Sequence, residues 1–193
     1  MSNRLQYSFV AIATCFAMHL TAAQNEPPLP TEGPAASAHW QVINDDVMGG
    51  ISTSQMRVST NGTLVFEGRV SLENNGGFAS VRSVPVLCDL TGCDAFSVRV
   101  RGDGRRYKFT VRTERRLDSA IYQAEFVTKA GEWEEHRLAF KEFVPTFRGR
   151  VLSGRPPLDP SRIVSVGFLI SDKQAGPFRL ETDWIKALRP AGQ

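Results

Sequence analysis

The feature that most constrains the fold is the alternation of apolar and polar residues along short segments of the chain. The alternation is clearest in residues 96–101, 107–112 and 178–184, and in the last of these it places Trp184 on the apolar face. A period of two residues with one apolar face is typical of β-strands that lie over a core. Residues 163–170 are apolar at nearly every position, as expected of a central strand covered on both faces.

Further strands and turns complete an all-β pattern. Six more segments are predicted to be strands: 55–59, 63–66, 69–73, 78–83, 121–127 and 132–138. Turn sequences separate them at Asn61-Gly62, Gly102-Asp103-Gly104 and Ala130-Gly131. About ten strands at this spacing predict two packed antiparallel sheets, which form a β-sandwich. Helix is expected only as short turns within 138–144 and 159–162, and the irregular stretch 145–160 is expected to wrap one end.

The N-terminus has the layout of a leader. Arg4 precedes an apolar run over residues 9–20, and the small-residue step Thr21-Ala22-Ala23 follows that run. This layout is typical of a cleavable signal peptide and predicts export to the periplasm or the medium, since the run is shorter than the roughly 20 residues of a spanning helix. A mitochondrial presequence, a lipoprotein signal ending at Cys15 and an uncleaved anchor are the alternatives. The predicted organisation is a signal peptide over 1–23, a flexible Pro/Ala-rich tether over 24–38, one domain over 39–189 and a tail over 190–193.

The charge balance argues against nucleic-acid binding. The 23 Lys and Arg residues against 20 Asp and Glu give a net charge of +3. The basic pairs Arg105-Arg106 and Arg115-Arg116 stand close to Asp103, Glu114 and Asp118, so no concentrated basic patch is predicted. No second apolar segment is long enough to cross a membrane, so the mature protein is not expected to span one.

Two cysteines remain after removal of the predicted signal peptide. Cys88 and Cys93 are separated by a turn-like Asp-Leu-Thr-Gly segment. In an exported chain this pair predicts a disulfide, and two half-buried thiols are the alternative. Structural zinc needs more ligands than this pair supplies, so no metal site is predicted there.

Two short loops combine oxygen-bearing side chains with a Gly-Gly step. Residues 44–50 carry Asn44, Asp45 and Asp46, and residues 73–78 carry a second acidic and amide group. The second group consists of Glu73, Asn74 and Asn75. Three interpretations stay open: side chains that lock the loops by binding backbone groups, contacts to a polar ligand or partner, and a calcium site. The ligands lack the alternate spacing of calcium loops, so no metal is predicted.

Five segments together resemble one known family. They are WQVINDDVMGGI at 40–51, SLENNGGFASVRS at 71–83, RVRGDGR at 99–105, FVPTFRG at 143–149 and GFLISDKQAGPF at 167–178. In this order they resemble the complex I intermediate-associated protein 30 family, over roughly Trp40 to Ile185. The resemblance implies a galactose-binding-like jelly roll. It also implies a non-catalytic role, because mitochondrial relatives assist the assembly of respiratory complex I.

The predicted function is protein binding as an assembly factor for a respiratory or envelope complex, without enzymatic activity and without a cofactor. The candidate binding surface comprises Asn44, Asp45, Asp46, Glu73, Asn74, Asn75, Arg82, Arg101, Tyr122, Phe147, Arg148, Asp172, Lys173 and Gln174. The two Gly-Gly loops are expected to share one end of the sandwich with Arg148 and 172–174. Two alternatives remain, a carbohydrate-binding module that uses some of these residues and a glycosidase-like pair formed by Asp45 and Glu73. Trp40, Trp133 and Trp184 are predicted to lie in the core.

Overall fold

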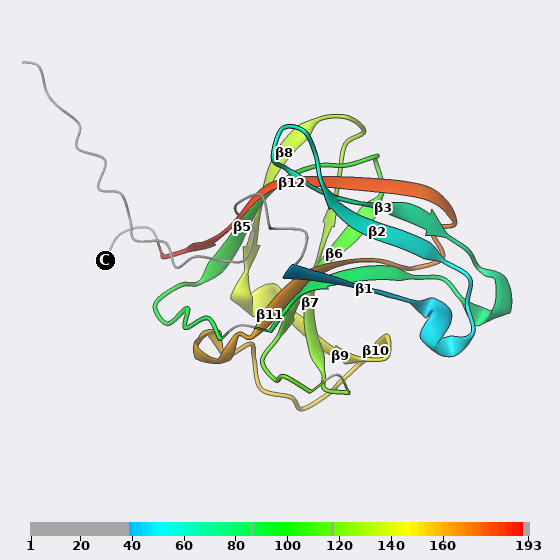
Figure 1. The fold of residues 1–193 in the computed structure, drawn as a ribbon. Helices are drawn as coiled ribbons and strands as arrows, with labels where there is room; N and C mark the ends of the chain where they lie inside the picture. The colour runs from blue at the N-terminus through cyan, green and yellow to red at the C-terminus, as the bar shows by residue number, and fades with distance from the viewer. Residues whose placement is uncertain (1–38, 86, 117, 191–193) are drawn as a thin grey trace, which may run out of the picture.

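The computed structural model describes residues 39–85, 87–116 and 118–190, and these residues form two antiparallel sheets packed face to face (Figure 1). The predicted all-β sandwich is confirmed. The predicted signal peptide, the whole predicted tether and the last three residues of the tail lie outside the described residues. The described part contains no helix long and apolar enough to cross a membrane.

The larger sheet has seven strands. In spatial order they are β1 (Trp40–Asn44), β4 (Ala79–Ser83), β11 (Ser165–Ile170), β6 (Arg106–Arg112), β7 (Ile121–Val127), β9 (Val144–Phe147) and β10 (Arg150–Val151). The apolar segment 163–170 therefore supplies β11, which pairs with β4 on one side and β6 on the other. This position near the middle of the sheet explains why nearly every residue of that segment is apolar.

The smaller sheet has five strands. In spatial order they are β2 (Thr53–Val58), β3 (Leu64–Val70), β12 (Gly176–Leu188), β5 (Ala95–Arg101) and β8 (Trp133–Ala139). The two strands predicted at 63–66 and 69–73 are one continuous strand, β3, because Gly68 leaves room for β2. A Cβ at Gly68 would lie 2.0 Å from the carbonyl oxygen of Thr53.

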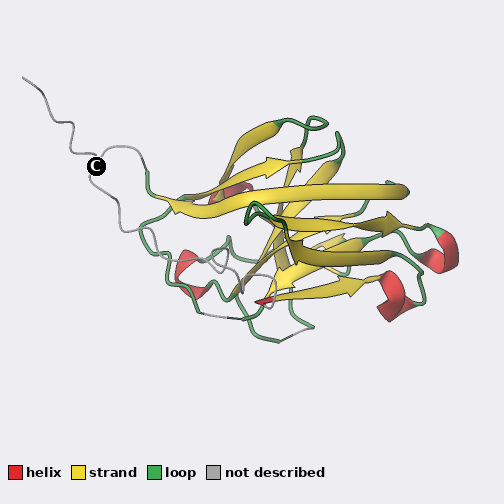
Figure 2. Ribbon diagram, turned by 45° about the horizontal axis from the view of Figure 1, so that its top comes forward, coloured by secondary structure: helices red, strands yellow, loops and turns green. Residues whose placement is uncertain are grey.

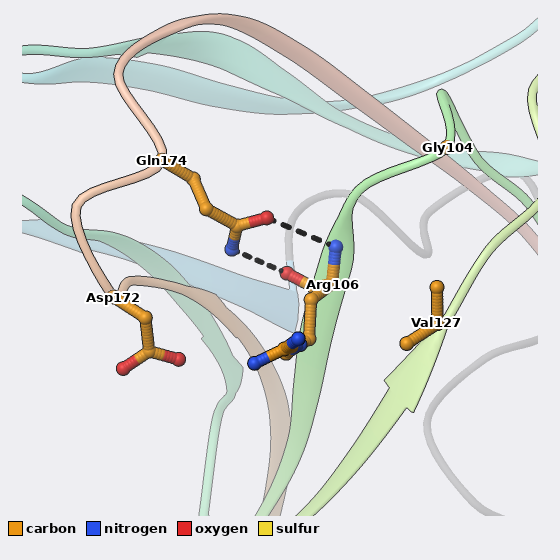
Figure 3. A pocket seen from close by; sticks show the side chains of 5 residues that line it. All are labelled: Gly104, Arg106, Val127, Asp172 and Gln174. Atoms are coloured by element: carbon orange, nitrogen blue, oxygen red, sulfur yellow. Dashed lines mark hydrogen bonds between the residues drawn. The ribbon is translucent and has the colours of Figure 1, made fainter.

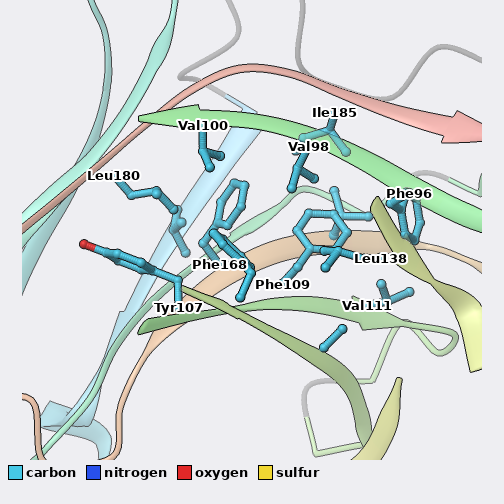
Figure 4. Packing of buried hydrophobic residues seen from close by; sticks show 14 of the residues in the cluster. Phe96, Val98, Val100, Tyr107, Phe109, Val111, Leu138, Phe168, Leu180 and Ile185 are labelled. Carbon is cyan, nitrogen blue, oxygen red and sulfur yellow. The ribbon is translucent and has the colours of Figure 1, made fainter. Parts of the chain in front are cut away.

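The core fills the space between the inner faces of the two sheets. Figure 4 shows its centre, where Phe96 of β5 meets Phe109 of β6 with ring centroids 5.1 Å apart. Phe109 in turn lies 5.4 Å from Phe168 of β11. The Phe96–Phe109 contact joins the two sheets, the Phe109–Phe168 contact joins neighbouring strands of the larger sheet, and both add to the burial of large apolar area. Trp40 lies in this core, as predicted.

A β-bulge changes the face on which Trp184 lies. The pairing of β12 with β5 shifts between Thr182 and Trp184, so that Trp184 lies opposite Arg99 and Ile185 lies opposite Val98. Ile185 is buried, and Trp184 is only partly buried on the outer face. The prediction that Trp184 belongs to the core is wrong, because an extra residue in one strand reverses the alternation after it.

The short helical turns lie in the connections. They are η2 (Asp45–Met48), η3 (Glu73–Asn75), η4 (Phe140–Glu142) and η5 (Pro160–Arg162), and η4 and η5 fall where turns were predicted. Figure 2 shows η2 and η3 close together at one end of the sandwich. The short strands β9 and β10 begin and end within or next to the stretch that was expected to be irregular.

Candidate functional site

One end of the sandwich collects the connections by which the chain crosses between the sheets. The register places the end of β1 beside the start of β4, at Asn44 and Ala79, and the end of β11 beside the same residue. We call this the crossover end; it consists of residues 45–52, 71–78, 102–105, 128–132 and 171–175. Both Gly-Gly loops and residues 172–174 therefore share one end.

A single buried carboxylate holds the two Gly-Gly loops together. Asp45 has no exposed surface, and its two oxygens accept four hydrogen bonds. The Ser52 backbone N–H and hydroxyl donate at 2.9 and 2.5 Å. The backbone N–H groups of Gly77 and Phe78 donate at 2.7 and 3.2 Å. Asp45 thus joins the β1–β2 connection to the β3–β4 connection across more than 30 positions of sequence.

Two glycines surround the Asp45 carboxylate closely. A Cβ at Gly50 would lie 2.4 Å from its Cγ, and a Cβ at Gly76 would lie 2.7 Å from its Oδ2. Both distances are shorter than real Cβ contacts, so a larger residue would displace the carboxylate. The Gly-Gly steps therefore serve close approach to Asp45 as well as tight turning, for which Gly49 has φ +90°.

Electrostatics keep Asp45 ionised. Burial alone raises the pKa of this carboxyl group. The hydrogen bonds from Ser52, Gly77 and Phe78 together lower the pKa by more than burial raises it, so the pKa lies below its ordinary value. The groups that point at the carboxylate are N–H and O–H donors, which would repel a cation. The arrangement is that of a loop lock, and no group of three or more metal-ligating side chains occurs in the described ranges.

The lock displays an exposed apolar surface that the sequence interpretation missed. Val47, Met48, Ile51 and Leu72 are 70, 57, 49 and 44% exposed, and we call them the apolar tip. The segments that carry Ile51 and Leu72 are tied to each other, since the Ser71 N–H donates to Ser52 Oγ at 3.0 Å. The sequence shows apolar residues next to the Gly-Gly steps, but it does not show that they are exposed, because their exposure depends on which loops the strand order brings together.

A second set of contacts fixes the remainder of the crossover end. Asp103 accepts hydrogen bonds from the Tyr107 hydroxyl at 2.9 Å and from the Arg179 N–H at 2.9 Å. The Gln174 amide exchanges hydrogen bonds with the backbone of Arg106 at 3.0 and 2.8 Å (Figure 3). Asp172 binds the Lys108 ammonium group at 2.7 Å. These polar groups are occupied within the protein and stiffen the connections.

A shallow pocket of about 280 Å³ lies beside this second set of contacts. Its lining consists of Gly104, Arg106, Val127, Asp172 and Gln174 (Figure 3). Arg106 is paired with Glu125 at 3.2 Å, so both charged lining residues already have partners. The pocket therefore offers few groups for orienting a ligand.

The other predicted binding residues lie elsewhere. Tyr122 points into the core and donates its hydroxyl to the Pro156 carbonyl at 3.0 Å. Phe147 and Arg148 follow Thr146, which pairs with Ile121 at the start of β7, whereas the crossover end adjoins Val127 at the end of β7. Arg148 is therefore remote from the two Gly-Gly loops, contrary to expectation.

Arg101 belongs to a layer of charges and aromatic rings on the outer face of the smaller sheet. Its guanidinium binds Glu181 at 2.7 Å and lies 5.0 Å from the centroid of the Trp133 ring. Arg99 lies 5.3 Å from the Trp133 ring and 4.9 Å from the Trp184 ring. Trp133 is therefore part of an outer layer and not of the core, which corrects a second prediction.

Cys88 and Cys93 are both thiols in the structure, so the predicted disulfide is not formed. The Cys88 N–H donates to the Ile163 carbonyl at 2.8 Å, which ties that residue to the segment before β11. The Cys93 N–H donates to the Leu90 carbonyl at 2.9 Å and closes a separate turn. Burial raises the pKa of both thiols, which disfavours the thiolate.

The proposed glycosidase pair lacks a reactive carboxylate. Asp45 is buried and fully engaged by backbone and hydroxyl donors, whereas Glu73 is exposed on η3. A glycosidase carboxylate must reach either the glycosidic oxygen or the anomeric carbon of a sugar. The geometry of Asp45 suits loop locking and does not suit catalysis.

Comparison with known proteins identifies relatives of this chain. The family model for complex I intermediate-associated protein 30 matches residues 30–182. The mitochondrial complex I intermediate-associated protein 30 of Mus musculus is 30% identical over 76% of this chain and 51% of its own length. The Drosophila melanogaster protein of the same name is 29% identical over 76% of this chain and 57% of its own length. The chain thus spans about half the length of these curated relatives.

Solved structures show a similar fold. The family 11 carbohydrate-binding module of Clostridium thermocellum has a TM-score of 0.60 at 15% identity, covering 80% of this chain and 90% of that one. The same module in complex with a β-1,3-1,4-mixed-linked tetrasaccharide has a TM-score of 0.62 at 14% identity, covering 87 and 97%. At this identity the likeness concerns the fold alone, and it confirms the galactose-binding-like jelly roll.

Proposed function

The chain belongs to the complex I intermediate-associated protein 30 family, and from this premise we propose that it is a non-catalytic protein-binding domain that assists assembly of a respiratory or envelope complex. We propose that the apolar tip is its docking surface. The occupant is an apolar patch on a subunit that is still unassembled, where side chains later buried in the complex are accessible to solvent.

The observation that carries this proposal is the exposure of four large apolar residues on a locked pair of loops. Exposed clusters of this kind mark interaction sites more often than isolated surface residues do. The Asp45 lock holds the backbone beneath them, so that little conformational entropy is lost on binding. Exposed acidic and amide groups lie on the same two loops, at Asp46, Glu73 and Asn74, and would form the polar rim of an interface.

The chemistry of the described residues supports a binding role over catalysis. His136 faces inward, with its ring centroid 5.0 Å from that of Phe126, and burial lowers its pKa. Neither thiol is activated, because burial raises the pKa of both. We find the nucleophile, base and orienting group of a hydrolase brought together nowhere in the described part of the chain.

Carbohydrate binding is the second candidate, because the solved neighbours include a module in complex with a tetrasaccharide. Sugar recognition commonly uses an open aromatic face beside polar groups. Here Arg99 and Arg101 lie within 5.3 Å of the centroid of the Trp133 ring. Arg99 and Lys186 lie within 5.2 Å of the centroid of the Trp184 ring. The cations occupy the positions that a sugar ring would need, so protein binding is the function we favour.

Partner capture in the native cells tests the proposal. The double variant Val47→Ser, Met48→Ser removes half of the tip, and the full-length chain is crosslinked in cells and its partners are identified by mass spectrometry. We expect the wild-type chain to capture subunits of a respiratory or envelope complex, and the variant to capture at least tenfold less. The crosslinked partners also report the compartment, which for the curated relatives is the mitochondrion.

A matched control comes from two apolar residues away from the tip. Val151 and Leu87 are 65 and 60% exposed, close to the values for Val47 and Met48. The variant Val151→Ser, Leu87→Ser should capture partners as the wild type does. Equal capture by the tip variant and the control variant would overturn the proposed docking surface, and capture of glycan alone would favour the carbohydrate module.

A further inference from the structure

The outer face of the smaller sheet carries a compact group of arginines. Residues opposite one another in antiparallel strands share a face. Three successive rows across β2, β3 and β12 lie on this face, namely Arg57-Val65-Glu181, Gln55-Glu67-Arg179 and Thr53-Arg69-Pro177. Arg101 of β5 extends the first row, opposite Glu181. We call Arg57, Arg69, Arg101 and Arg179 the arginine face.

The arginine face has more positive than negative charge. Arg57 binds Glu67 at 2.8 Å, and Arg101 binds Glu181 at 2.7 Å. Arg179 binds both of these carboxylates, with 3.3 Å to Glu181. Arg69 is exposed and forms no ion pair within the described part of the chain. Four guanidinium groups are therefore set against two carboxylates.

The carboxylates lie deeper than the guanidinium groups that they bind. The side chains of Glu67 and Glu181 are 23 and 3% exposed, whereas those of Arg57, Arg101 and Arg179 are 40–45% exposed. Other groups occupy the carboxylates further: the Gln55 amide donates to Glu67 at 2.9 Å, and the Thr63 hydroxyl donates to Glu181 at 2.6 Å. A molecule that approaches this face therefore meets guanidinium N–H donors before it meets a carboxylate.

The arginine side chains are held close to the sheet. Val65 lies on this outer face and outside the apolar core, yet it has no exposed surface. The long side chains in the rows around it must therefore cover it, as the apolar stems of arginines do elsewhere. Stems fixed by packing and by ion pairs lose little conformational entropy when their guanidinium groups bind a partner.

We propose that the arginine face binds an acidic segment of a partner protein. A guanidinium group has five N–H donors in a planar fork that matches a carboxylate, and the two glutamates engage only part of this set. Asp and Glu side chains of the partner would accept the remaining donors and balance the excess positive charge. This surface is separate from the apolar tip and does not depend on the function proposed for it.

Two features of the arginine face favour an acidic protein over other polyanions. Nucleic acid is bound by basic footprints that follow many phosphates, whereas here two carboxylates interrupt a small group of cations. A membrane surface is bound with apolar side chains inserted beside the basic ones, and the large apolar residues that are exposed in the described ranges lie outside these rows. A short acidic segment matches both the size and the mixed charge of the face.

Fluorescence anisotropy of a labelled peptide of alternating Glu and Asp residues, titrated with the full-length chain at physiological ionic strength, tests the proposal. We expect saturable binding to the wild type and at least fivefold weaker binding to Arg57→Gln, Arg69→Gln. The single variant Arg69→Gln breaks no ion pair in the described structure, so it should keep the fold and still weaken binding at least twofold. The absence of saturable binding to the wild type would overturn the proposal.

A matched control removes two arginines from another surface. Arg116 is exposed and paired with Asp118, as Arg57 is paired with Glu67, and Arg150 of β10 is exposed like Arg69. Arg116→Gln, Arg150→Gln should bind the peptide as the wild type does. Equal weakening by both double variants would show that binding follows net charge alone and would overturn the site.

Two further probes address the chemistry of the partner. A single-stranded oligonucleotide of the same length and vesicles of anionic phospholipid replace the peptide in the same titration. Tighter binding of either probe than of the peptide, lost on Arg57→Gln, Arg69→Gln, would overturn the assignment to an acidic protein. The tip variant Val47→Ser, Met48→Ser should bind the peptide as the wild type does, so a failure of either surface leaves the other measurable.

Discussion

Asp45 holds together two connections that lie far apart in the sequence, and its contribution comes from the donors that it satisfies. Three backbone N–H groups and one hydroxyl point at its oxygens, in a place that water does not reach. A buried donor without an acceptor costs about 1–3 kcal/mol. Removal of this one carboxylate therefore affects both loops at once.

We predict that Asp45→Asn lowers the free energy of unfolding by about 3 kcal/mol at neutral pH, because an amide cannot accept at both positions. The measurement is urea denaturation of the variant and the wild type. The neighbouring variant Asp46→Asn is the control, and it should change the free energy by less than about 0.5 kcal/mol because Asp46 is exposed. Equal effects of the two changes would contradict the lock.

The same residue predicts a pH dependence. The pKa of Asp45 in the folded chain lies below its ordinary value of 3.8, so the folded state favours the ionised form. Its stabilisation is complete above that ordinary value and is lost as the pH falls through the folded pKa. The difference in unfolding free energy between the wild type and Asp45→Asn should therefore be constant above pH 4 and should shrink below it. A difference that grows on acidification would contradict this assignment.

At the level of elements, local sequence patterns predict where strands lie, but they do not predict how the strands pair or where a bulge interrupts the pairing. Alternation located the segments that became β5, β6 and the middle of β12, and continuous apolarity located β11. The pattern could not reveal the bulge in β12, because the inserted residue is recognised only against the partner strand. Likewise, Tyr122 looked like a ligand contact, although the inward face of β7 buries it.

The candidate site was predictable only in part, because local patterns identify loop residues but do not identify which loops meet. The Asx side chains and glycines of the two Gly-Gly loops indicated a constructed corner, and one of the interpretations kept open, loop locking, matches the geometry of Asp45. Which loops meet depends on strand order, and the order β1-β4-β11-β6 pairs segments that are distant in sequence. The exposure of Val47 and Met48 depends on that arrangement and could not be read from a local pattern.

The bulge leads to a prediction that compares two tryptophans. Trp40→Ala should lower the free energy of unfolding by about 3–5 kcal/mol, because it leaves a cavity beside Phe168 in the core. Trp184→Ala should cost about 1–2 kcal/mol, because Trp184 lies on the outer face, where Arg99 and Lys186 cover it. Denaturation of the two variants measures both costs, and a larger cost for Trp184 would contradict the register shift.

At the scale of the whole molecule, the two ends of the sandwich differ in their construction. The crossover end gathers inter-sheet connections and fixes them through Asp45, Asp103 and Gln174. It then exposes apolar side chains on the connections fixed by Asp45. A rigid end with an unsatisfied apolar surface suits a protein that holds a partner during assembly and contributes no chemistry of its own.

The central claim is that the apolar tip carries the assembly role, and the most direct measurement is complementation. Cells that lack the protein would express the wild type, the variant Val47→Ser, Met48→Ser, or the control variant Val151→Ser, Leu87→Ser. Partner capture identifies the complex. Native gel electrophoresis of the cells would then quantify its fully assembled form and its assembly intermediates. We predict that the wild type and the control restore the assembled complex, while the tip variant leaves intermediates at the level of cells without the protein. Full restoration by a stably folded tip variant would contradict the account.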